Sequence, residues 1–177
     1  VVDVSDRTAP EVVAELDTAG TSIDIKVVGD LAYIADGESG LVIMDVSDPL
    51  SPTLVSEIDT AGIAQDVVVQ LDYAYVADGD SGIEIFNVSN PEMPVSASVL
   101  GGLSRVTGIA VEEDVVVVTA GSAMVAIDVT DRASPMRLGS VNIGQVKDLV
   151  ISNGFAHVAS YSQGYRVVDV RNPLDPV

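Results

Sequence analysis

The stretch Gly40-Leu41-Val42-Ile43-Met44-Asp45-Val46-Ser47-Asp48-Pro49 decides the fold, because it recurs along the whole chain. It reads as an apolar strand that runs into a Ser-Asp-Pro turn. Self-similarity at a fixed period is the signature of a repeat protein, and the 177 residues therefore form one repeat domain. The four residues near the end of this stretch occur in five versions, 41 or 42 positions apart: Asp3-Val4-Ser5-Asp6, Asp45-Val46-Ser47-Asp48, Asn87-Val88-Ser89-Asn90, Asp128-Val129-Thr130-Asp131 and Asp169-Val170-Arg171-Asn172.

Charge and composition exclude several classes of function. Eight Lys and Arg residues face 27 Asp and Glu residues, a net charge of −19 that would repel phosphate backbones, so we expect no nucleic-acid partner. Without cysteine the chain has no disulfide, thiolate metal site or cysteine nucleophile. The apolar stretch from Val115 to Ile127 is too short and interrupted for a membrane helix, so no membrane insertion is predicted. The chain opens at Val1 inside a repeat, and we expect its N-terminus to be processed or trimmed.

Each repeat is expected to contain four short strands and no helix. In the second copy the strands are Asp66 to Gln70, Tyr73 to Ala77, Ile83 to Val88 and Val95 to Leu100. They are separated by Gly- and Asp-rich turns and by Ser89-Asn90-Pro91. β-branched runs such as Val115 to Val118 suit strands that are buried on both faces.

Four antiparallel strands per 41–42 residues predict an all-β fold: a β-propeller, or a propeller-like arc of about four four-stranded blades. The expected division is residues 1–20 as third and fourth strands of a leading blade, repeats at 21–62, 63–104 and 105–144, and an incomplete last repeat at 145–177. Under this division the chain has one more copy of the third strand than a four-bladed ring needs. The chain could form a four-bladed ring with a spare strand, be a fragment of a larger ring, or be an open arc that pairs with another copy.

Two segments carry a family resemblance. Residues 73–82 followed by Ile83 to Val88, and Leu31 to Gly40 followed by Leu41-Val42-Ile43-Met44-Asp45, resemble the LVIVD repeat, which is named for its third strand. The resemblance extends over all four copies, although the Asp-Gly turn becomes Ala120-Gly121-Ser122 in the third and residues 160–164 in the fourth. It implies a propeller, found mostly in secreted or surface-attached prokaryotic proteins and commonly without a described enzymatic activity.

Three aspartates share one repeat position at the start of the first strands. They are Asp24, Asp66 and Asp148, and Gly108 replaces them in the third copy. The first strand of a propeller blade lies nearest the axis, so these carboxylates could surround a channel mouth and hold a cation. Alternatively, each accepts backbone N–H bonds in its own loop. The sequence leaves both interpretations open.

Other polar residues give weaker indications. Asp36, Glu38, Asp78 and Asp80 lie in Gly-rich turns that resemble calcium loops, but calcium takes six to eight oxygens and hairpin turn chemistry explains them as well. Calcium is thus the one cofactor that we consider, and otherwise we expect none. His157, the single histidine, has no second ligand for a metal and is expected to pack or form a local hydrogen bond.

The sequence favours a non-catalytic extracellular or cell-surface scaffold from a prokaryote. Its expected partners are other copies of itself, as a homo-oligomer or filament, or other surface proteins and glycans. The alternatives are a metal-dependent or carbohydrate-active propeller enzyme that uses the acidic mouth, and a ligand-binding sensor domain of a larger surface protein. The expected interaction residues are on edge strands at the chain ends: Val1, Val2, Asp3, Val4, Tyr165, Arg166, Val167 and Val168.

Overall fold

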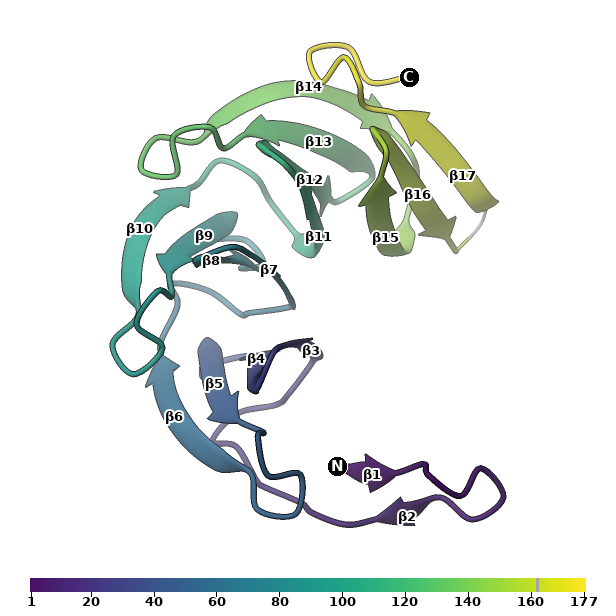
Figure 1. Cartoon of the computed structure of the whole chain (residues 1–177). Helices are drawn as coiled ribbons and strands as arrows, with labels where there is room; N and C mark the ends of the chain where they lie inside the picture. Colours follow the sequence, from purple (N-terminus) through teal and green to yellow (C-terminus); the bar gives the residue numbers. More distant parts are fainter. Residues whose placement is uncertain (162) are drawn as a thin grey trace.

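A computed structural model describes residues 1–161 and 163–177, which form strands and turns (Figure 1). No helix long and apolar enough to cross a membrane occurs in this part of the chain. The strands are β1 (Val2–Asp3), β2 (Glu11–Val12), β3 (Asp24–Val28), β4 (Leu31–Ala35), β5 (Leu41–Asp45), β6 (Thr53–Ile58), β7 (Asp66–Gln70), β8 (Tyr73–Ala77), β9 (Ile83–Asn87), β10 (Val95–Leu100), β11 (Val106–Glu112), β12 (Val115–Ala120), β13 (Ala123–Asp128), β14 (Met136–Asn142), β15 (Val146–Ser152), β16 (Phe155–Ser160) and β17 (Gly164–Asp169).

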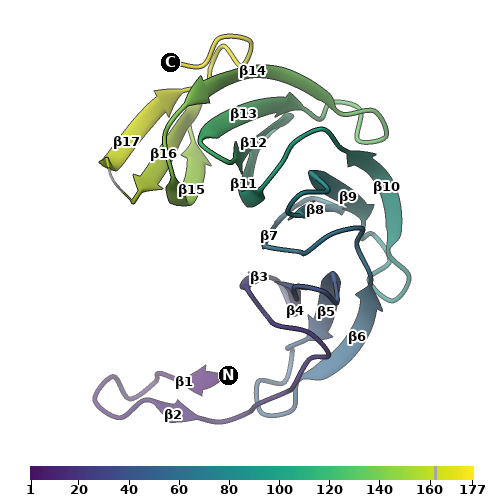
Figure 2. The same ribbon diagram turned by 180° about the vertical axis from the view of Figure 1, so that it is seen from behind.

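The strands form four successive antiparallel blades, so the predicted all-β propeller architecture is confirmed. Strands β3 to β6, β7 to β10 and β11 to β14 make three four-stranded sheets, and β15 to β17 make a three-stranded one. Figures 1 and 2 show the blades in an open arc, with first strands on the inside and fourth strands along the outer rim. The hairpin β1–β2 and the last blade lie at opposite ends of this arc. The open arc disagrees with the first outcome considered for closure, the four-bladed ring, and agrees both with a fragment of a larger ring and with an arc that pairs with another copy.

Apolar side chains alternate between the two faces of each blade, and neighbouring blades bury them between each other. Tyr75, Ile83 and Ile85 on the second blade pack against Val116 and Ile127 on the third. We call these the outgoing face of one blade and the incoming face of the next. The other junctions repeat the pattern, with Ile43 against Phe86 and Met124 against Val158. Burial on both faces explains why the third strands β5 and β13 are almost continuously apolar.

The recurring Asp-Val-Ser-Asp phrase has a local structural role. At the end of β5, the Asp45 carboxylate accepts the Ser47 N–H at 2.8 Å, and Asp48 accepts the Leu50 N–H at 3.0 Å. Such Asx turns fix the direction of the chain after the strand. The hydroxyl and N–H of Ser47 hold the pKa of Asp45 below its usual value. The first bond recurs at all five copies, in Asp3–Ser5, Asp45–Ser47, Asn87–Ser89, Asp128–Thr130 and Asp169–Arg171.

The N-terminal segment occupies the predicted repeat position but forms less strand than expected. We expected strands at Val1 to Val4 and Glu11 to Asp17, whereas β1 and β2 have two residues each. The Asp3–Glu11 pair has the same register as Asp45–Thr53 in the first blade. The hairpin is exposed because no first and second strands cover it, and an isolated two-stranded ribbon is only marginally stable.

Hydrogen bonds fasten the first blade to the second, and the second to the third, at three levels. Near the axis, a first-strand aspartate accepts an N–H from the following first strand, as described below. Next to the Asp-Gly turns, Gly37 pairs with Ala64 and Gly79 with Val106 through two backbone bonds each. At the rim, the Ser98 hydroxyl donates to the Arg132 carbonyl at 2.6 Å, and the Ser56 hydroxyl donates to the Pro91 carbonyl at 2.7 Å.

Candidate functional site

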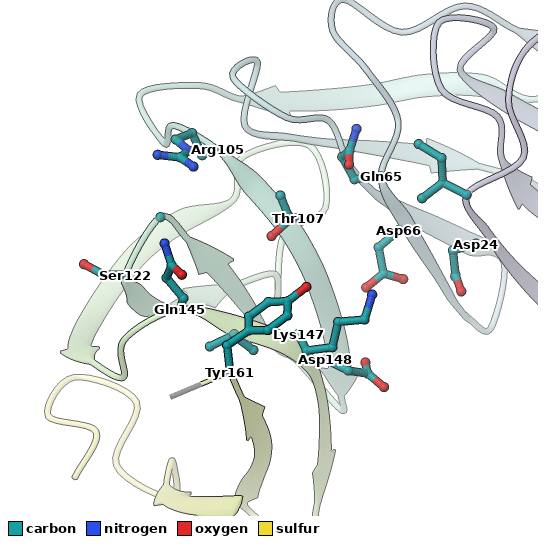
Figure 3. A pocket seen from close by; sticks show the side chains of 13 residues that line it. Asp24, Gln65, Asp66, Arg105, Thr107, Ser122, Gln145, Lys147, Asp148 and Tyr161 are labelled. Atoms are coloured by element: carbon teal, nitrogen blue, oxygen red, sulfur yellow. The ribbon is translucent and has the colours of Figure 1, made fainter. Parts of the chain in front are cut away.

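A cavity of about 740 Å³ opens at the inner side of the arc, where the first strands of all four blades meet (Figure 3). Its wall is mostly polar. Asp24, Asp66, Lys147 and Asp148 point toward one region of it in Figure 3. The predicted axial aspartates are therefore brought to one mouth. The full lining is Ile23, Asp24, Gln65, Asp66, Arg105, Thr107, Gly121, Ser122, Gln145, Val146, Lys147, Asp148 and Tyr161.

Two of the axial aspartates join consecutive blades rather than capping their own loops. The Asp24 carboxylate accepts the N–H of Val67 at 3.3 Å, and the Asp66 carboxylate accepts the N–H of Ile109 at 2.8 Å. Both donors lie 43 residues downstream, on the first strand of the next blade. The own-loop interpretation was wrong at these positions, because the inner edge of a first strand has no neighbouring strand and its N–H groups need another acceptor.

Asp66 has an unusual protonation equilibrium. Its pKa is raised to about 7, mainly by burial; the hydrogen bond with the Asp24 carboxyl and the charge of Asp24 also raise it, and the N–H groups of Ile109 and Val67 lower it. Two adjacent carboxyls in a poorly solvated site share one proton more readily than they both ionise. Near neutral pH, the Asp24–Asp66 pair therefore exchanges a proton with solvent.

The other two repeat positions break the pattern. Gly108 has no carboxylate to offer the fourth blade, and the N–H of Leu149, which stands at the position of Ile109, bonds instead to the carboxylate of Asp148 at 2.8 Å. Asp148 thus fits the own-loop interpretation, and it is exposed. Lys147 is the residue of this mouth that the sequence analysis did not single out. Its place beside Asp148 in the first strand was the available signal.

The turn aspartates Asp36 and Asp78 are fully buried. Asp78 accepts the Thr60 hydroxyl at 2.7 Å and the Gly62 N–H at 2.8 Å. Asp36 binds the equivalent loop, accepting bonds from the hydroxyls of Thr18 and Ser22 and from the Gly20 N–H. Each carboxylate thus holds the connecting loop, the segment that leads from one blade's fourth strand into the next blade. Turn chemistry alone does not account for this.

The connecting loop needs glycine where it passes the turn. A Cβ on Gly62 would lie 2.4 Å from the Asp78 carbonyl oxygen, and one on Gly20 would lie 2.1 Å from the Asp36 carbonyl oxygen. In the third blade Ala120 replaces the aspartate, and Gly102 and Ser104 stand where Thr60 and Gly62 stand in the second. All three members of this hydrogen-bonded unit, threonine, glycine and aspartate, are therefore replaced in the third blade.

The two remaining turn acids lie apart from these buried carboxylates. Glu38 and Asp80 are exposed, and Asp80 accepts the N–H of Arg105 in the next connecting loop at 2.9 Å. Among residues 1–161 and 163–177, no three His, Cys, Asp or Glu side chains are grouped so that they could hold a metal ion. Calcium binding at these turns remains a hypothesis.

We expect calcium to leave the stability unchanged. The oxygens of Asp36 and Asp78 already accept bonds from N–H and O–H donors, which occupy the directions that a cation would need. Thermal melts in a chelator, in millimolar calcium and in equal magnesium should give the same Tm. The magnesium sample controls for general screening of the acidic surface. A Tm raised by calcium and not by magnesium would contradict this expectation.

His157 forms the local hydrogen bond that the sequence predicted. Its Nδ1 lies 2.7 Å from the Tyr165 hydroxyl, and the two rings stack with their centroids 6.1 Å apart. The nearby Arg171 binds Asp169, lowering the pKa of that carboxyl to about 2, and lies over the Phe155 ring. These contacts pair His157 with Tyr165 and Arg171 with Asp169, all within the last blade.

Comparison with known proteins supports the repeat assignment. A family model described as LVIVD repeat matches residues 19–60, 61–99 and 143–177. The third copy, which the resemblance was expected to include, is not matched, although residues 106–142 form a complete blade. Its altered Ala120-Gly121-Ser122 turn and the loss of the Asp-Thr-Gly unit are the visible departures. A search of curated proteins gave no match.

Solved structures show the same architecture. The chain is similar to the computationally designed Ika4 protein, with a TM-score of 0.71 and 12% identity over 89% of this chain and 96% of that one. It is also similar to the computationally designed Ika8 protein, with a TM-score of 0.67 and 11% identity over 82% of this chain. It spans 45% of the Ika8 chain. At these identities the similarity concerns the fold alone.

Proposed function

This chain belongs to the LVIVD repeat family, and from that premise we propose that it is a non-catalytic interaction module that binds proteins at the open ends of its arc. The family resemblance also supports display outside the cell or on the surface of a prokaryote. The acidic surface favours partners other than nucleic acid. In this role the repeats supply a rigid frame, and the unpaired ends supply recognition.

The observation that carries the proposal is the open outer edge of β17 in the three-stranded last sheet. In the third blade β13 pairs with β14 starting at Asp128–Met136. In the last blade the corresponding pair is Asp169–Val177, joined by two backbone hydrogen bonds. Along the rest of β17, which precedes Asp169 in the sequence, the outer edge offers backbone N–H and C=O groups to an added strand. Such edges are standard sites of β-strand addition.

The face beside this edge is also uncovered. Tyr165 is 70% exposed and Val167 47%, whereas Ile83 and Ile85, their equivalents in the second blade, are fully buried. Val168 points to the opposite face and is buried against the third blade, so its backbone, and not its side chain, is available. An exposed edge next to an apolar face is what a bound strand needs.

The hydrogen-bond partners of His157 and of the two buried carboxylates support a non-catalytic role. A serine nucleophile in the Gly-rich turns would need a base, and His157 is paired with Tyr165 on the last blade. Asp36 and Asp78, the buried carboxylates, hold loops in place. Their hydrogen bonds account for their burial without a chemical role.

A second candidate function is ligand or metal binding in the axial cavity, either as an enzyme or as a sensor. The observation that favours it is the raised pKa of Asp66 within a polar cavity, a combination that occurs often at functional sites. Elemental analysis that detects a bound metal, together with loss of that metal in Asp66→Ala, would favour this candidate over the interaction module.

A peptide tests the interaction module. We expect a labelled peptide with the sequence of β14, Met136–Asn142, to bind the chain saturably by fluorescence anisotropy, because it supplies the fourth strand that β17 lacks. A control peptide with proline at positions 140 and 141 should not bind: neighbouring N–H groups of a strand point to opposite sides, so one of the two must face β17. Equal binding of both peptides, or of neither, would contradict strand addition.

A further inference from the structure

The three junctions inside the chain define which surface covers an outgoing face. In each of them, an apolar outgoing face packs against the incoming face of the next blade. A fourth strand runs along the rim, and a connecting loop carries the chain to the next first strand. The segment from Ile58, the end of β6, to Asp66 makes this passage between the first and second blades. Any polypeptide that presents a fourth strand, a connecting loop and an apolar incoming face can therefore continue the array.

The N-terminal end of the chain presents those parts. Residues 11–16 stand at the repeat position of β6, and the loop through Gly20 leads to β3 in the way that the loop through Gly62 leads to β7. On β3, Ile25 and Val27 are 58% and 55% exposed. At the next junction the equivalent of Ile25, Val67, is 1% exposed, and the equivalent of Val27, Val69, is partly buried, because the preceding blade covers them.

The C-terminal end presents the complementary surface. Tyr165, Val167 and Val150 form an exposed outgoing face, and β17 has a place for a fourth strand. Asp169 pairs there with Val177, as Asp3 pairs with Glu11 in the hairpin. Residues 11–16 of another chain therefore fit β17 in the register that they now use with β1, and they fill the whole edge rather than one position.

Resting on the proposed interaction function, we infer that the partner is a second copy of this chain, joined head to tail. Residues 11–16 of one copy become the fourth strand of the other copy's last blade, and the first blade that follows packs Ile25 and Val27 against Tyr165 and Val167. The hairpin partner β1 is displaced, and so is Val177, which now occupies the position opposite Asp169. Strand β1 holds β2 through only two residue pairs, so the exchange gains pairing.

Two such junctions close a two-fold assembly. Because each copy offers one outgoing and one incoming end, two copies satisfy each other's ends reciprocally, whereas a junction that fails to close would grow into a filament. The open shape of the arc in Figures 1 and 2 leaves room for a second copy between its two ends. A surface of charge −19 opposes association, so salt should strengthen the dimer.

Cysteine cross-linking tests the register, and the absence of native cysteine makes the experiment clean. Val12 pairs with Val2, and Val168 has the same repeat position as Val2, so Val12 of one copy should face Val168 of the other. Under oxidation, a mixture of Val12→Cys and Val168→Cys chains should give a disulfide-linked species of twice 18.3 kDa. Each variant alone should not. Cross-linking within one chain in the double variant, by contrast, would show a self-closed ring and overturn the inference.

Sedimentation measurements test whether the outgoing face of the last blade is part of the contact between two copies. The native chain should be dimeric at about 100 μM, and more so in high salt. The double variant Tyr165→Glu and Val167→Glu should dissociate at least tenfold more readily. Met93→Glu, which adds a charge at a residue 72% exposed on a rim turn, is the control and should leave the dimer intact. A monomeric native chain in high salt would overturn the inference. If that monomer still bound the β14 peptide, the proposed function would stand, and if it did not, both would fail.

Discussion

Replacing Asp78 with alanine is expected to lower the free energy of unfolding by about 3 kcal/mol. Asp78 is fully buried and satisfies two donors, the Thr60 hydroxyl and the Gly62 N–H. Alanine would leave both of them without a partner at a junction between blades, and each unsatisfied buried donor costs roughly 1–3 kcal/mol. Against a typical total of about 5–15 kcal/mol, this is a large fraction of the stability. Urea unfolding followed by circular dichroism measures it.

Asparagine at the same position separates hydrogen bonding from charge. Its amide oxygen can accept the Gly62 N–H while its nitrogen donates to the Thr60 hydroxyl, so Asp78→Asn should stay within about 1 kcal/mol of the native chain. Burial raises the pKa of Asp78, which means that the site gains little from the charge itself. If alanine and asparagine destabilised equally, charge and not loop anchoring would be the function of this carboxylate.

Asp66 should make the stability depend on pH between about 4 and 7. The folded state holds the Asp66 proton up to a pKa of about 7, whereas an unfolded aspartate releases it near 4. The folded chain therefore binds more protons in this window, and the free energy of unfolding falls as the pH rises through it, by roughly 2–4 kcal/mol. The loss is complete about one pH unit above 7, where Asp66 is ionised in the folded chain as well.

The variant Asp66→Asn should remove that dependence. Its amide can still accept the Ile109 N–H and donate to Asp24, so the variant should exceed the native chain in stability at pH 8 and match it more closely at pH 5. Urea midpoints at several pH values measure this. Asp30→Asn makes the same chemical change at an exposed turn and should leave the slope in place. An unchanged slope in Asp66→Asn would assign it to the general negative charge.

The fold could be predicted because its signals are local and repeated. The Leu41–Asp45 strand with its Asx turn occurs five times, and the three middle copies meet nearly the same environment. The N-terminal hairpin was overestimated for the same reason: residues 11–17 have a strand sequence, but strand length depends on partners that the sequence pattern does not reveal. Residues without a covering blade form only a short ribbon.

The candidate site was predictable only as a position. Equal repeat spacing placed Asp24, Asp66 and Asp148 at one mouth, but their hydrogen bonds depend on the next blade. Whether an N–H group of the next blade finds an acceptor depends on how the blades pack in the tertiary structure. The loop-holding role of Asp36 and Asp78 likewise depends on residues 18 positions upstream, which approach the turn only after the blades have packed.

The fastenings between blades also set the order in which the arc can come apart. The first two junctions combine an axial aspartate, a paired glycine and a rim serine, whereas Gly108 removes the axial bond at the third. There Glu112 accepts two N–H groups of the next blade, from Asn153 and Gly154, and Gly139 bonds the Pro173 carbonyl. In a linear array each interface contributes its own increment of cooperativity. The last blade, which is held by one neighbouring blade through this different set of bonds, can therefore detach in a sub-global opening that leaves three blades folded.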